Sequence, residues 1–388
     1  MTSIHRIPTD KVELGMFVSE QTPNLLDTGL NSRGLISRPE TLATLTGSGI
    51  KEIYIDTQKG KSSSYSCPVL TAPGALTPTV SLAEERQRAS KIYSEARDLV
   101  GNAVRDVKMG KAIDLGPIEQ LADDVCESVL ANANALACLS QIREKDQYLM
   151  EHSINVGILM GVFSSYLGYD GDELHQMVTG AILHDMGKIR VPDSVLNKTG
   201  KLTDAEWKEM RNHVLYGEEA LLKSPGISDI AISICAQHHE KLNGEGYPRG
   251  LKDTEITTYG RMASIVDIYD AITADRVYHK GKSPFDTMRI LASLGKAELD
   301  KNLVYQFIRC MSVYPVGTLL ELSNGKLGVV IQVHPTKPNA PIIKCFCSLY
   351  PRNFERPTIV NIGSPENTIS IVKAHDPNSL GIKVRNFI

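Results

Sequence analysis

Imidazole and carboxylate side chains recur at the ends of apolar segments in the middle of the chain. His184 and Asp185 are adjacent at the end of the stretch AILHD, and Lys188 follows three residues later. Neutral imidazole and carboxylate are ligand types suited to divalent Fe, Mn, Ni or Zn. Because adjacent side chains on a helix diverge by ~100°, one carboxylate could reach between two ions while the imidazole binds one of them. Taken alone the pair means little, since a hydrogen-bonded histidine beside a surface aspartate is more common.

Further histidines occur in neighbouring segments with helical patterns. His152 lies within the apolar stretch EHSINVGILMGVF, where an unpaired imidazole would cost about 1–3 kcal/mol. His213 ends the stretch EMRNH, and His238 with His239 ends the stretch ISDIAISICAQHH. Each of these has an ordinary structural explanation, such as a capped histidine or a surface turn. Their succession along the chain makes them candidates for one shared site.

A pair of carboxylates completes the set. Asp267 and Asp270 stand three residues apart in ASIVDIYDAITADR, so a helix would place them on one face of an otherwise apolar segment. A solvated acidic face explains such a pair in isolation. Five successive helical segments that each supply a ligand-type residue are hard to explain by coincidence. The sequence therefore predicts a metal site.

The segments that carry these residues belong to a long predicted helical region in the centre of the chain. Ser81 with Glu84, and Thr203 with Glu206, form capping-box patterns at two helix starts. Trp207, the only tryptophan, follows the second of these starts, and we expect it to be a packing anchor.

The flanking regions differ from this centre in composition and period, which predicts a mainly α protein with a small α+β module before the helices and a β-rich segment after them. The stretch KGKSSSYSCPVLTAPGALTP is rich in Ser, Pro and Gly without a period and is predicted to be a linker. Asn324-Gly325 is typical of a hairpin turn, and APIIKCFCSLY of a further strand. The predicted parts are the α+β module at 1–58, the linker at 59–80, a helical lead-in at 81–144, the main helical domain at 145–311 and the β-rich segment at 312–388.

The composition excludes some classes of function. The chain carries 42 Lys and Arg against 45 Asp and Glu, a net charge of -3, without a basic run, so we expect no nucleic-acid polymer as a partner. No stretch approaches the ~20 apolar residues of a membrane span, and the N-terminal residues do not resemble a signal peptide. Seven cysteines without a CxxC pair suit free thiols in a reducing compartment. We therefore expect a cytoplasmic protein that does not bind a membrane.

Three stretches resemble the HD-GYP family, metal-dependent HD-domain phosphohydrolases that cleave cyclic dinucleotides. They are HDMGKIRVPDSVLNKTGKLTDAEW, HHEKLNGEGYPRGL and RMASIVDIYDAITADRVY, the second of which contains the Gly-Tyr-Pro of the family name. The resemblance covers about residues 145–311 and implies an all-helical HD-type catalytic domain there. Residues 1–58 resemble the small domain of unknown function that often precedes HD-GYP domains, which implies a regulatory role for this module.

The resemblance further implies a centre of two divalent transition-metal ions, Fe, Mn or Ni. The first ion would be held by His152, His184, Asp185 and Asp267. The second would share Asp185 and be completed by His213, His238 and His239. Some relatives hold a third ion through a glutamate about one turn before the first histidine. Here Tyr148 stands four residues before His152, so we expect two ions.

Other positions match family residues that contact the substrate. Lys188 would contact the scissile phosphate and, with Asp185, take part in catalysis. Asp270 and Arg276 would contact the nucleotide and its phosphates. His279 stands where relatives often carry Lys or Arg, a departure that affects the expected affinity or base preference.

The loop NGEGYP leaves several interpretations open. Tyr247 is a candidate substrate contact, whereas the loop as a whole is equally explained as a tight turn that holds His238, His239 and Glu240 in place. It is also a candidate surface for a partner protein, as is the N-terminal module. A homodimer is compatible with the sequence.

The implied reaction is hydrolysis of a cyclic dinucleotide by attack of a metal-bridging hydroxide. Two ions about 3.5–4 Å apart would lower the pKa of the attacking water and neutralise the phosphate oxygens, and Lys188 would add a donor to those oxygens. The substrate would be cyclic di-GMP, opened to pGpG and onward to GMP, or 3′,3′-cyclic GMP-AMP. The alternative function is a non-catalytic sensor of such a nucleotide. An HD phosphohydrolase of ppGpp or dNTPs is disfavoured by the GYP segment.

Overall fold

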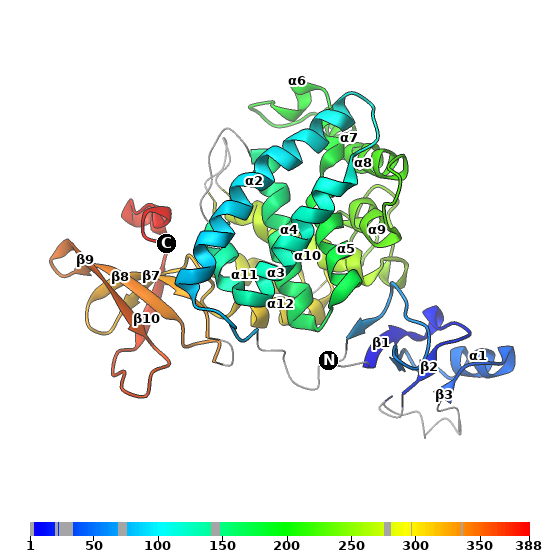
Figure 1. Ribbon diagram of the computed structural model, residues 1–388, viewed down its shortest axis with the longest axis horizontal. Coiled ribbons are helices and arrows are strands. Elements are labelled where there is room, and N and C mark those ends of the chain that lie inside the picture. Colours follow the sequence, from blue (N-terminus) through cyan, green and yellow to red (C-terminus); the bar gives the residue numbers. More distant parts are fainter. Residues whose placement is uncertain are drawn as a thin grey trace.

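The computed structural model describes residues 4–19, 22, 34–68, 76–140, 148–274, 281–295, 297–334 and 337–388. A helical body occupies the centre of the molecule, with the N-terminal module at one end and the C-terminal sheet at the other (Figure 1). The protein is mainly α, as the sequence predicts. Among the helices of these ranges, none has both the length and the hydropathy that a membrane span requires.

The helical body begins where the sequence predicts a helix start. The Ser81 hydroxyl accepts from the Glu84 N–H, the Glu84 carboxylate accepts from the Ser81 N–H, and the same reciprocal cap joins Thr203 to Glu206. Such caps satisfy N–H groups that have no partner within the helix. The helices of the body are α2 (Leu82–Lys108), α3 (Leu115–Leu139), α4 (Tyr148–Leu167), α5 (Gly171–Leu183), α6 (Asp193–Leu196), α7 (Asp204–Arg211), α8 (His213–Leu222), α9 (Asp229–Gln237), α10 (Thr258–Thr273), α11 (Pro284–Leu294) and α12 (Lys301–Met311), with a 3₁₀ segment, η4, at Met186–Arg190.

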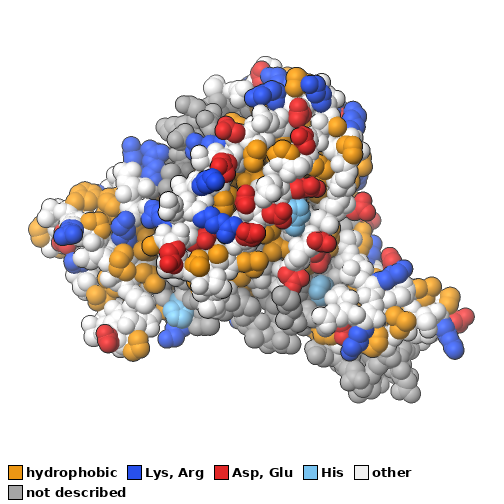
Figure 2. Space-filling model, viewed as in Figure 1, with side chains coloured by type: hydrophobic (Ala, Val, Ile, Leu, Met, Phe, Trp, Pro, Cys, Tyr) orange, Lys and Arg blue, Asp and Glu red, His pale blue; other side chains and the backbone are white. Residues whose placement is uncertain are grey.

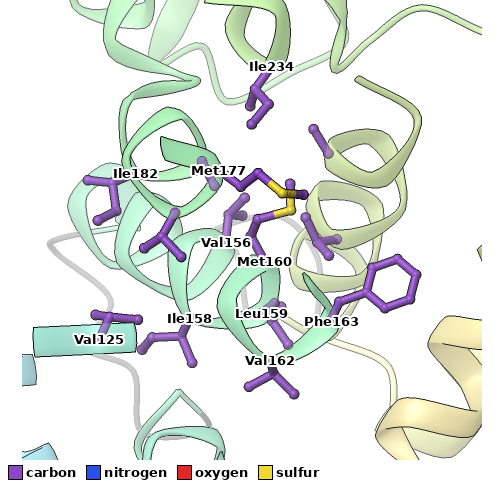
Figure 3. Close-up of a cluster of buried hydrophobic side chains, with 14 of the residues drawn as sticks. Val125, Val156, Ile158, Leu159, Met160, Val162, Phe163, Met177, Ile182 and Ile234 are labelled. Carbon is purple, nitrogen blue, oxygen red and sulfur yellow. The ribbon is translucent and has the colours of Figure 1, made fainter. Parts of the chain in front are cut away.

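One apolar cluster runs through the body from α2 to α12. Val156, Met160 and Phe163 of α4 lie in this cluster with Met177 of α5 and Ile234 of α9 (Figure 3). Burying a side chain of this size contributes about 1.5–3 kcal/mol to folding, so α4 is held rigidly between its neighbours. Because α2 and α3 share the cluster with α4 and α5, the boundary predicted at 144/145 does not separate two cores. The domain boundaries themselves stay predictions.

The N-terminal module is a small antiparallel sheet with one helix. Within the described residues its strands are β1 (Ile4–Pro8), β2 (Phe17–Val18), β3 (Gly34–Leu35), β4 (Glu52–Asp56) and β5 (Cys67–Pro68), in the order β3-β2-β4-β1-β5, with α1 at Pro39–Thr46. Strand β5 pairs with β1, so that Cys67 lies opposite Arg6. The prediction of a linker from residue 59 is therefore wrong in its first part. The Ser- and Pro-rich composition conceals this strand because its pairing partner lies about 60 residues away in the sequence.

Hydrogen bonds join the N-terminal module to the helical body. The Tyr169 hydroxyl, just after α4, donates to the Ser66 carbonyl at 3.2 Å, and the Thr258 N–H at the start of α10 donates to the Ser64 carbonyl at 3.1 Å. His5 is buried beside Ser66, and burial lowers the pKa of its imidazole to about 4. The module thus contacts the residues that follow α4 and the start of α10, two helices that carry candidate ligands.

The C-terminal segment forms an antiparallel sheet, as its period predicts. Its strands in the described ranges are β6 (Leu319–Leu322), β7 (Lys326–Gln332), β8 (Ile342–Leu349), β9 (Arg352–Asn361) and β10 (Ile371–His375), in the order β10-β6-β7-β8-β9. The predicted Asn324-Gly325 turn joins β6 to β7, and Gly325 adopts a φ of 74° there, a left-handed conformation that glycine adopts without strain. Acidic and basic side chains are interspersed over the face of the molecule in Figure 2, consistent with its small net charge.

Candidate metal centre

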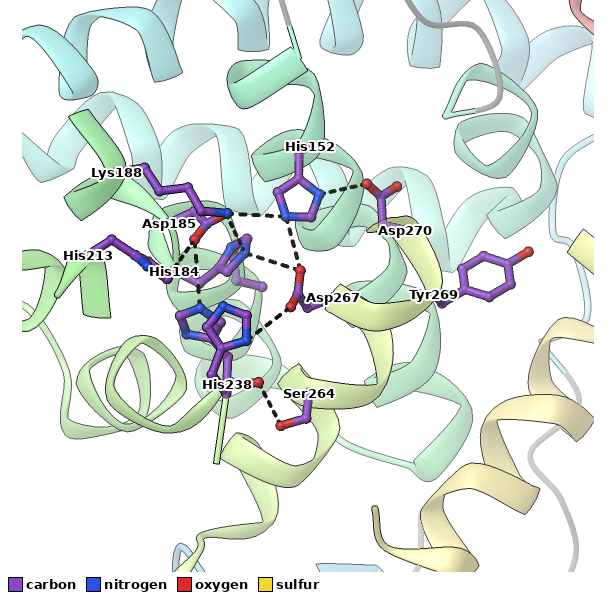
Figure 4. A network of polar contacts seen from close by, with 12 residues as sticks. His152, His184, Asp185, Lys188, His213, His238, Ser264, Asp267, Tyr269 and Asp270 are labelled. Carbon is purple, nitrogen blue, oxygen red and sulfur yellow. Dashed lines mark hydrogen bonds and ion pairs between the residues drawn. The ribbon is translucent and has the colours of Figure 1, made fainter. Parts of the chain in front are cut away.

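The predicted ligands come from helices that are distant in the chain and converge in the middle of the body (Figure 4). His152 lies in the first turns of α4, and His184 with Asp185 directly follows α5. The remaining positions lie at the start of α8, at the end of α9 and within α10, namely His213, His238, His239 and Asp267. Helix ends thus supply most of the polar groups, while α4 and α10 contribute His152 and Asp267 from within the helix.

Two glycines allow these helix ends to approach closely. A Cβ on Gly187 would lie 2.0 Å from the His213 carbonyl oxygen and 2.4 Å from the Gly217 nitrogen. A Cβ on Gly217 would in turn lie 2.8 Å from Cys235 Sγ, whose thiol contacts the His184 carbonyl oxygen at 3.3 Å. The glycine of the HDMGK stretch is therefore required for α8 to bring its histidine against the turn after α5.

In the Gly187→Ala protein, the free energy of unfolding should therefore be about 2 kcal/mol lower than in the wild type. The added carbon would overlap with backbone atoms, and a side-chain rotation cannot relieve that overlap. Its metal content should fall as well, since α8 must move away from Asp185. Chemical denaturation and elemental analysis of the same preparation measure both effects. Gly200→Ala is the matched control, because no atom lies within 4 Å of the added carbon. Wild-type stability and metal content in the Gly187 variant would contradict this account of the packing.

Backbone carbonyls fix the orientation of three of the histidine rings. The Nδ1 atoms lie 2.7 Å, 2.6 Å and 2.8 Å from carbonyl oxygens three residues earlier in the chain. The pairs are His184 with Ala181, His213 with Met210 and His238 with Cys235. Because a carbonyl only accepts, each Nδ1 carries the proton, and each Nε2 is left with a lone pair directed into the cluster.

Several buried atoms in the cluster lack a hydrogen bond. The Nε2 atoms of His184, His213 and His238 and the Oδ1 atom of Asp185 have no hydrogen-bond partner among the residues described. Each of the three Nε2 atoms lies within ion-pair distance of an Asp185 oxygen: Oδ2 for His184, and Oδ1 for His213 and His238. A buried polar atom left unsatisfied costs about 1–3 kcal/mol, and coordination of a cation is what such convergent lone pairs satisfy. The residues fit a metal centre.

Asp185 stands at the centre of this arrangement. Its Oδ2 lies 3.3 Å from His152 Nε2 and 3.4 Å from His184 Nε2. Its Oδ1 lies 3.3 Å from His213 Nε2 and 3.7 Å from His238 Nε2. The two oxygens therefore face different sets of imidazoles. The ligand atoms form two compact groups that have Asp185 in common: one with His152 and His184, the other with His213, His238 and His239.

Asp267 lies beside both groups. Its Oδ1 is 3.1 Å from His152 Nε2, and its Oδ2 is 3.8 Å from His239 Nδ1. Burial by itself would raise the pKa values of Asp185 and Asp267, but other groups outweigh it. The Lys188 ammonium and nearby imidazoles hold the pKa of Asp185 well below its usual range, and nearby imidazoles do the same for the pKa of Asp267. Burial lowers the pKa values of His213 and His239. Ionised carboxylates and neutral imidazoles are the forms that bind metals.

Lys188 and Asp270 lie against opposite sides of the cluster. The Lys188 ammonium contacts Asp185 Oδ2, and 19% of its side chain is exposed. Asp270 Oδ2 lies 2.7 Å from His152 Nδ1, and the Asp270 side chain is only 1% exposed. The sequence assigns Asp270 to the nucleotide, whereas this geometry is that of a carboxylate that orients a histidine. Of the other predicted substrate contacts, Arg276 lies outside the described residues, as does His279.

The GYP loop folds back onto the two histidines at the end of α9. The buried Glu240 carboxylate accepts from the N–H groups of Arg249 at 2.7 Å and Leu251 at 2.9 Å. A Cβ on Gly246 would lie 2.4 Å from the Lys241 nitrogen, so the loop approaches its own base too closely for any other residue. The Tyr247 ring centroid lies 4.6 Å from that of His239. The loop therefore holds the histidine pair in place and also covers it with an aromatic ring.

The chain is similar to known proteins along most of its length. Residues 124–303 match the HD domain family, and residues 4–118 match a domain of unknown function, DUF3391. The chain is 34% identical over 379 residues to a cyclic di-GMP phosphodiesterase of Pseudomonas aeruginosa, which covers 95% of this chain and 91% of that protein. It is 35% identical over 142 residues to a 3′3′-cGAMP-specific phosphodiesterase of Vibrio cholerae, which covers 37% of this chain and 30% of that protein.

A solved structure of an HD-GYP-type protein from Bdellovibrio bacteriovorus aligns with a TM-score of 0.49 at 17% identity, over 78% of this chain and 98% of that one. The family assignment rests on the alignment with the Pseudomonas protein, which extends over nearly the full length of the chain. This alignment includes both the N-terminal module and the helices of the candidate centre. By this relationship the chain belongs to the HD-GYP family of HD-domain proteins.

Proposed function

We propose that this chain is a metal-dependent phosphodiesterase that hydrolyses a cyclic dinucleotide. The observation that carries the proposal is the pair of ligand groups that share Asp185, with the Lys188 ammonium at the same carboxylate. Such an arrangement suits a reaction in which a phosphodiester anion must be bound, polarised and attacked at one place.

The two groups would hold two divalent transition-metal ions, Fe, Mn or Ni. The first group consists of His152, His184, Asp185 and Asp267, and the second consists of Asp185, His213, His238 and His239. When bound, such ions supply Lewis acidity that lowers the pKa of water toward neutrality and neutralises phosphate oxygens. The predominance of imidazole over carboxylate leaves the site with little negative charge, so an anionic substrate can approach.

Two further side chains, the Lys188 ammonium and the Asp270 carboxylate, take part in the proposed mechanism. Lys188 is partly exposed beside Asp185, from where its ammonium can donate to the non-bridging oxygens of a bound phosphate as negative charge builds there. Asp270 holds the proton of His152 on Nδ1 and keeps Nε2 aimed at the centre. We infer that Asp270 is a positioning residue and that Tyr247 forms part of the wall against which the nucleotide lies.

The relatives suggest which nucleotides to test. The Pseudomonas protein that aligns along nearly the whole chain is a cyclic di-GMP phosphodiesterase, whereas the Vibrio protein specific for 3′3′-cGAMP aligns over about a third of it. Cyclic di-GMP, opened to pGpG and then to GMP, is therefore the first candidate substrate, and 3′,3′-cyclic GMP-AMP is the second.

The test is a product assay on the purified, full-length protein loaded with Mn or Fe. Cyclic di-GMP, 3′,3′-cyclic GMP-AMP, cyclic di-AMP and ppGpp are incubated separately, and products are separated by chromatography while metal content is measured on the same sample. Linear dinucleotide from at least one cyclic substrate is the expected result. Saturable nucleotide binding without product across several metals would instead favour the non-catalytic sensor.

The Asp270→Asn protein should bind metal about 10–100-fold more weakly, or turn over more slowly by a similar factor, because an amide can present a donor to His152 Nδ1 and so disturb the tautomer. Metal titration followed by calorimetry measures the loss. Asp229→Asn, at an exposed position at the start of α9, is the control. If the Asp270 variant bound metal with wild-type affinity and showed a raised KM, Asp270 would be a substrate contact and not a residue that orients His152.

A further inference from the structure

A row of aromatic and cationic side chains leads away from the candidate centre toward solvent. It consists of Trp207 and Arg211 on α7 and of Tyr247 in the GYP loop. The Trp207 side chain is 45% exposed, and α7 buries none of its residues. The expectation that Trp207 is a packing anchor is therefore wrong. The solvent exposure of such a large aromatic side chain therefore needs an explanation other than packing.

Three contacts of similar length link Trp207 to the histidine cluster. The Arg211 guanidinium lies 5.5 Å from the centre of the Trp207 ring and 5.3 Å from the centre of the Tyr247 ring. The Tyr247 ring lies 4.6 Å from the His239 ring at an angle of 31°. The row therefore begins at a candidate ligand and ends at an exposed indole. A nucleotide whose phosphate lies at the cluster would extend its sugar and base along this path.

Arg211 differs from other arginines of the helical body in its surroundings. Arg190 pairs with Glu219 at 2.7 Å, and Arg249 pairs with Glu218. Within the ranges that the structure describes, no carboxylate lies within ion-pair distance of Arg211, and its contacts there are the two aromatic rings. A guanidinium that contacts aromatic rings and no carboxylate keeps its charge and its N–H donors available.

We propose that Trp207 and Arg211 bind one nucleobase of the substrate, with the indole stacked on the base and the guanidinium held between that stack and Tyr247. The inference rests on the proposed function, because it assumes a nucleotide at the centre. Every base has a π-face, so the stack contributes affinity for the cyclic dinucleotide without selecting guanine over adenine. Trp207 and Arg211 are thus positioning residues, remote from the reacting phosphate.

Trp207 is the only tryptophan in the chain, so its fluorescence reports on this position alone. The full-length, Mn-loaded protein is titrated with a phosphorothioate analogue of cyclic di-GMP, which is hydrolysed slowly. We expect saturable quenching of the emission, with a midpoint equal to the Kd from equilibrium dialysis. In dialysis, Trp207→Ala should weaken binding about 10-fold, whereas Trp207→Phe should retain most of the affinity because it keeps an aromatic face.

Steady-state kinetics distinguish positioning from a structural role. The Trp207→Ala protein should show a KM raised about 10-fold with little change in kcat and an unchanged melting temperature. Tyr305→Ala is the matched control, because Tyr305 is also an exposed aromatic ring under a cation, Lys301, and lies on α12 at the other end of the body (Figure 1). It should leave the KM unchanged.

Each other outcome has a distinct meaning. Hydrolysis with no change in Trp207 emission and a wild-type KM in Trp207→Ala would overturn the proposal while leaving the proposed function intact. A lower kcat and melting temperature with an unchanged KM would make Trp207 a structural residue and also overturn it. Absence of both binding and hydrolysis in the wild-type, metal-loaded protein would instead count against the proposed function itself.

Discussion

Replacing Asp185 by asparagine is expected to reduce kcat/KM at least about 1,000-fold and to weaken metal binding in both ligand groups. The reason is that each carboxylate oxygen faces a different pair of imidazoles, at 3.3–3.4 Å for Oδ2 and 3.3–3.7 Å for Oδ1. An amide offers one acceptor in place of two and carries no charge. Its nitrogen would also direct N–H groups at one set of imidazoles. Turnover and metal content per chain measure the two losses.

Asp193→Asn is the control for this variant, because Asp193 is exposed at the start of α6, eight residues further along the same motif. It should bind metal and turn over as the wild type does. If the Asp185 variant retained full metal content and lost only activity, Asp185 would act on the substrate and would not join the two ligand groups.

Replacing Lys188 by alanine is expected to reduce kcat about 100–1,000-fold while metal content stays near the wild-type value. This is the effect of removing one fixed donor to the developing charge in a reaction of this kind. Lys188 contacts Asp185 but contributes no lone pair to either ligand group, because an ammonium only donates. Lys188→Arg, which keeps the charge with different geometry, should recover part of the rate.

The pair of variants separates two explanations for the position of Lys188. Rapid-quench measurement of a single turnover reports the chemical step, and elemental analysis reports the metal. A Lys188→Ala protein that lost metal in parallel with activity would show that the ammonium serves chiefly to hold Asp185 in place.

The sequence is informative about the centre because most of the candidate ligands stand at helix ends that local patterns already define. His184 and Asp185 directly follow an apolar helix, and His238 follows another, so both the element and the direction of the side chain can be predicted from the period. The convergence of these ends depends on close backbone packing at Gly187 and Gly217. The motif contains Gly187, whereas Gly217 lies outside the motif stretches, and only the tertiary structure gives the reason for either glycine.

Other features depend on contacts between distant residues and so were not predictable. Asp270 shares a helix face with Asp267, which the sequence indicates, but its bond to His152 joins residues 118 positions apart. Strand β5 lies in a Ser- and Pro-rich stretch and exists only because β1 pairs with it. Trp207 follows a helix start as a packing residue would, yet the helix that carries it lies on the surface.

The most direct test of the shared-carboxylate centre is anomalous scattering from crystals of the Mn- or Fe-loaded protein, with data on either side of the metal edge. Two peaks are expected about 3.5–4 Å apart, one on the side of Asp185 that faces His152 and His184 and the other on the side that faces His213 and His238. A single peak that lies away from Asp185, or two peaks that have no ligand in common, would contradict the account.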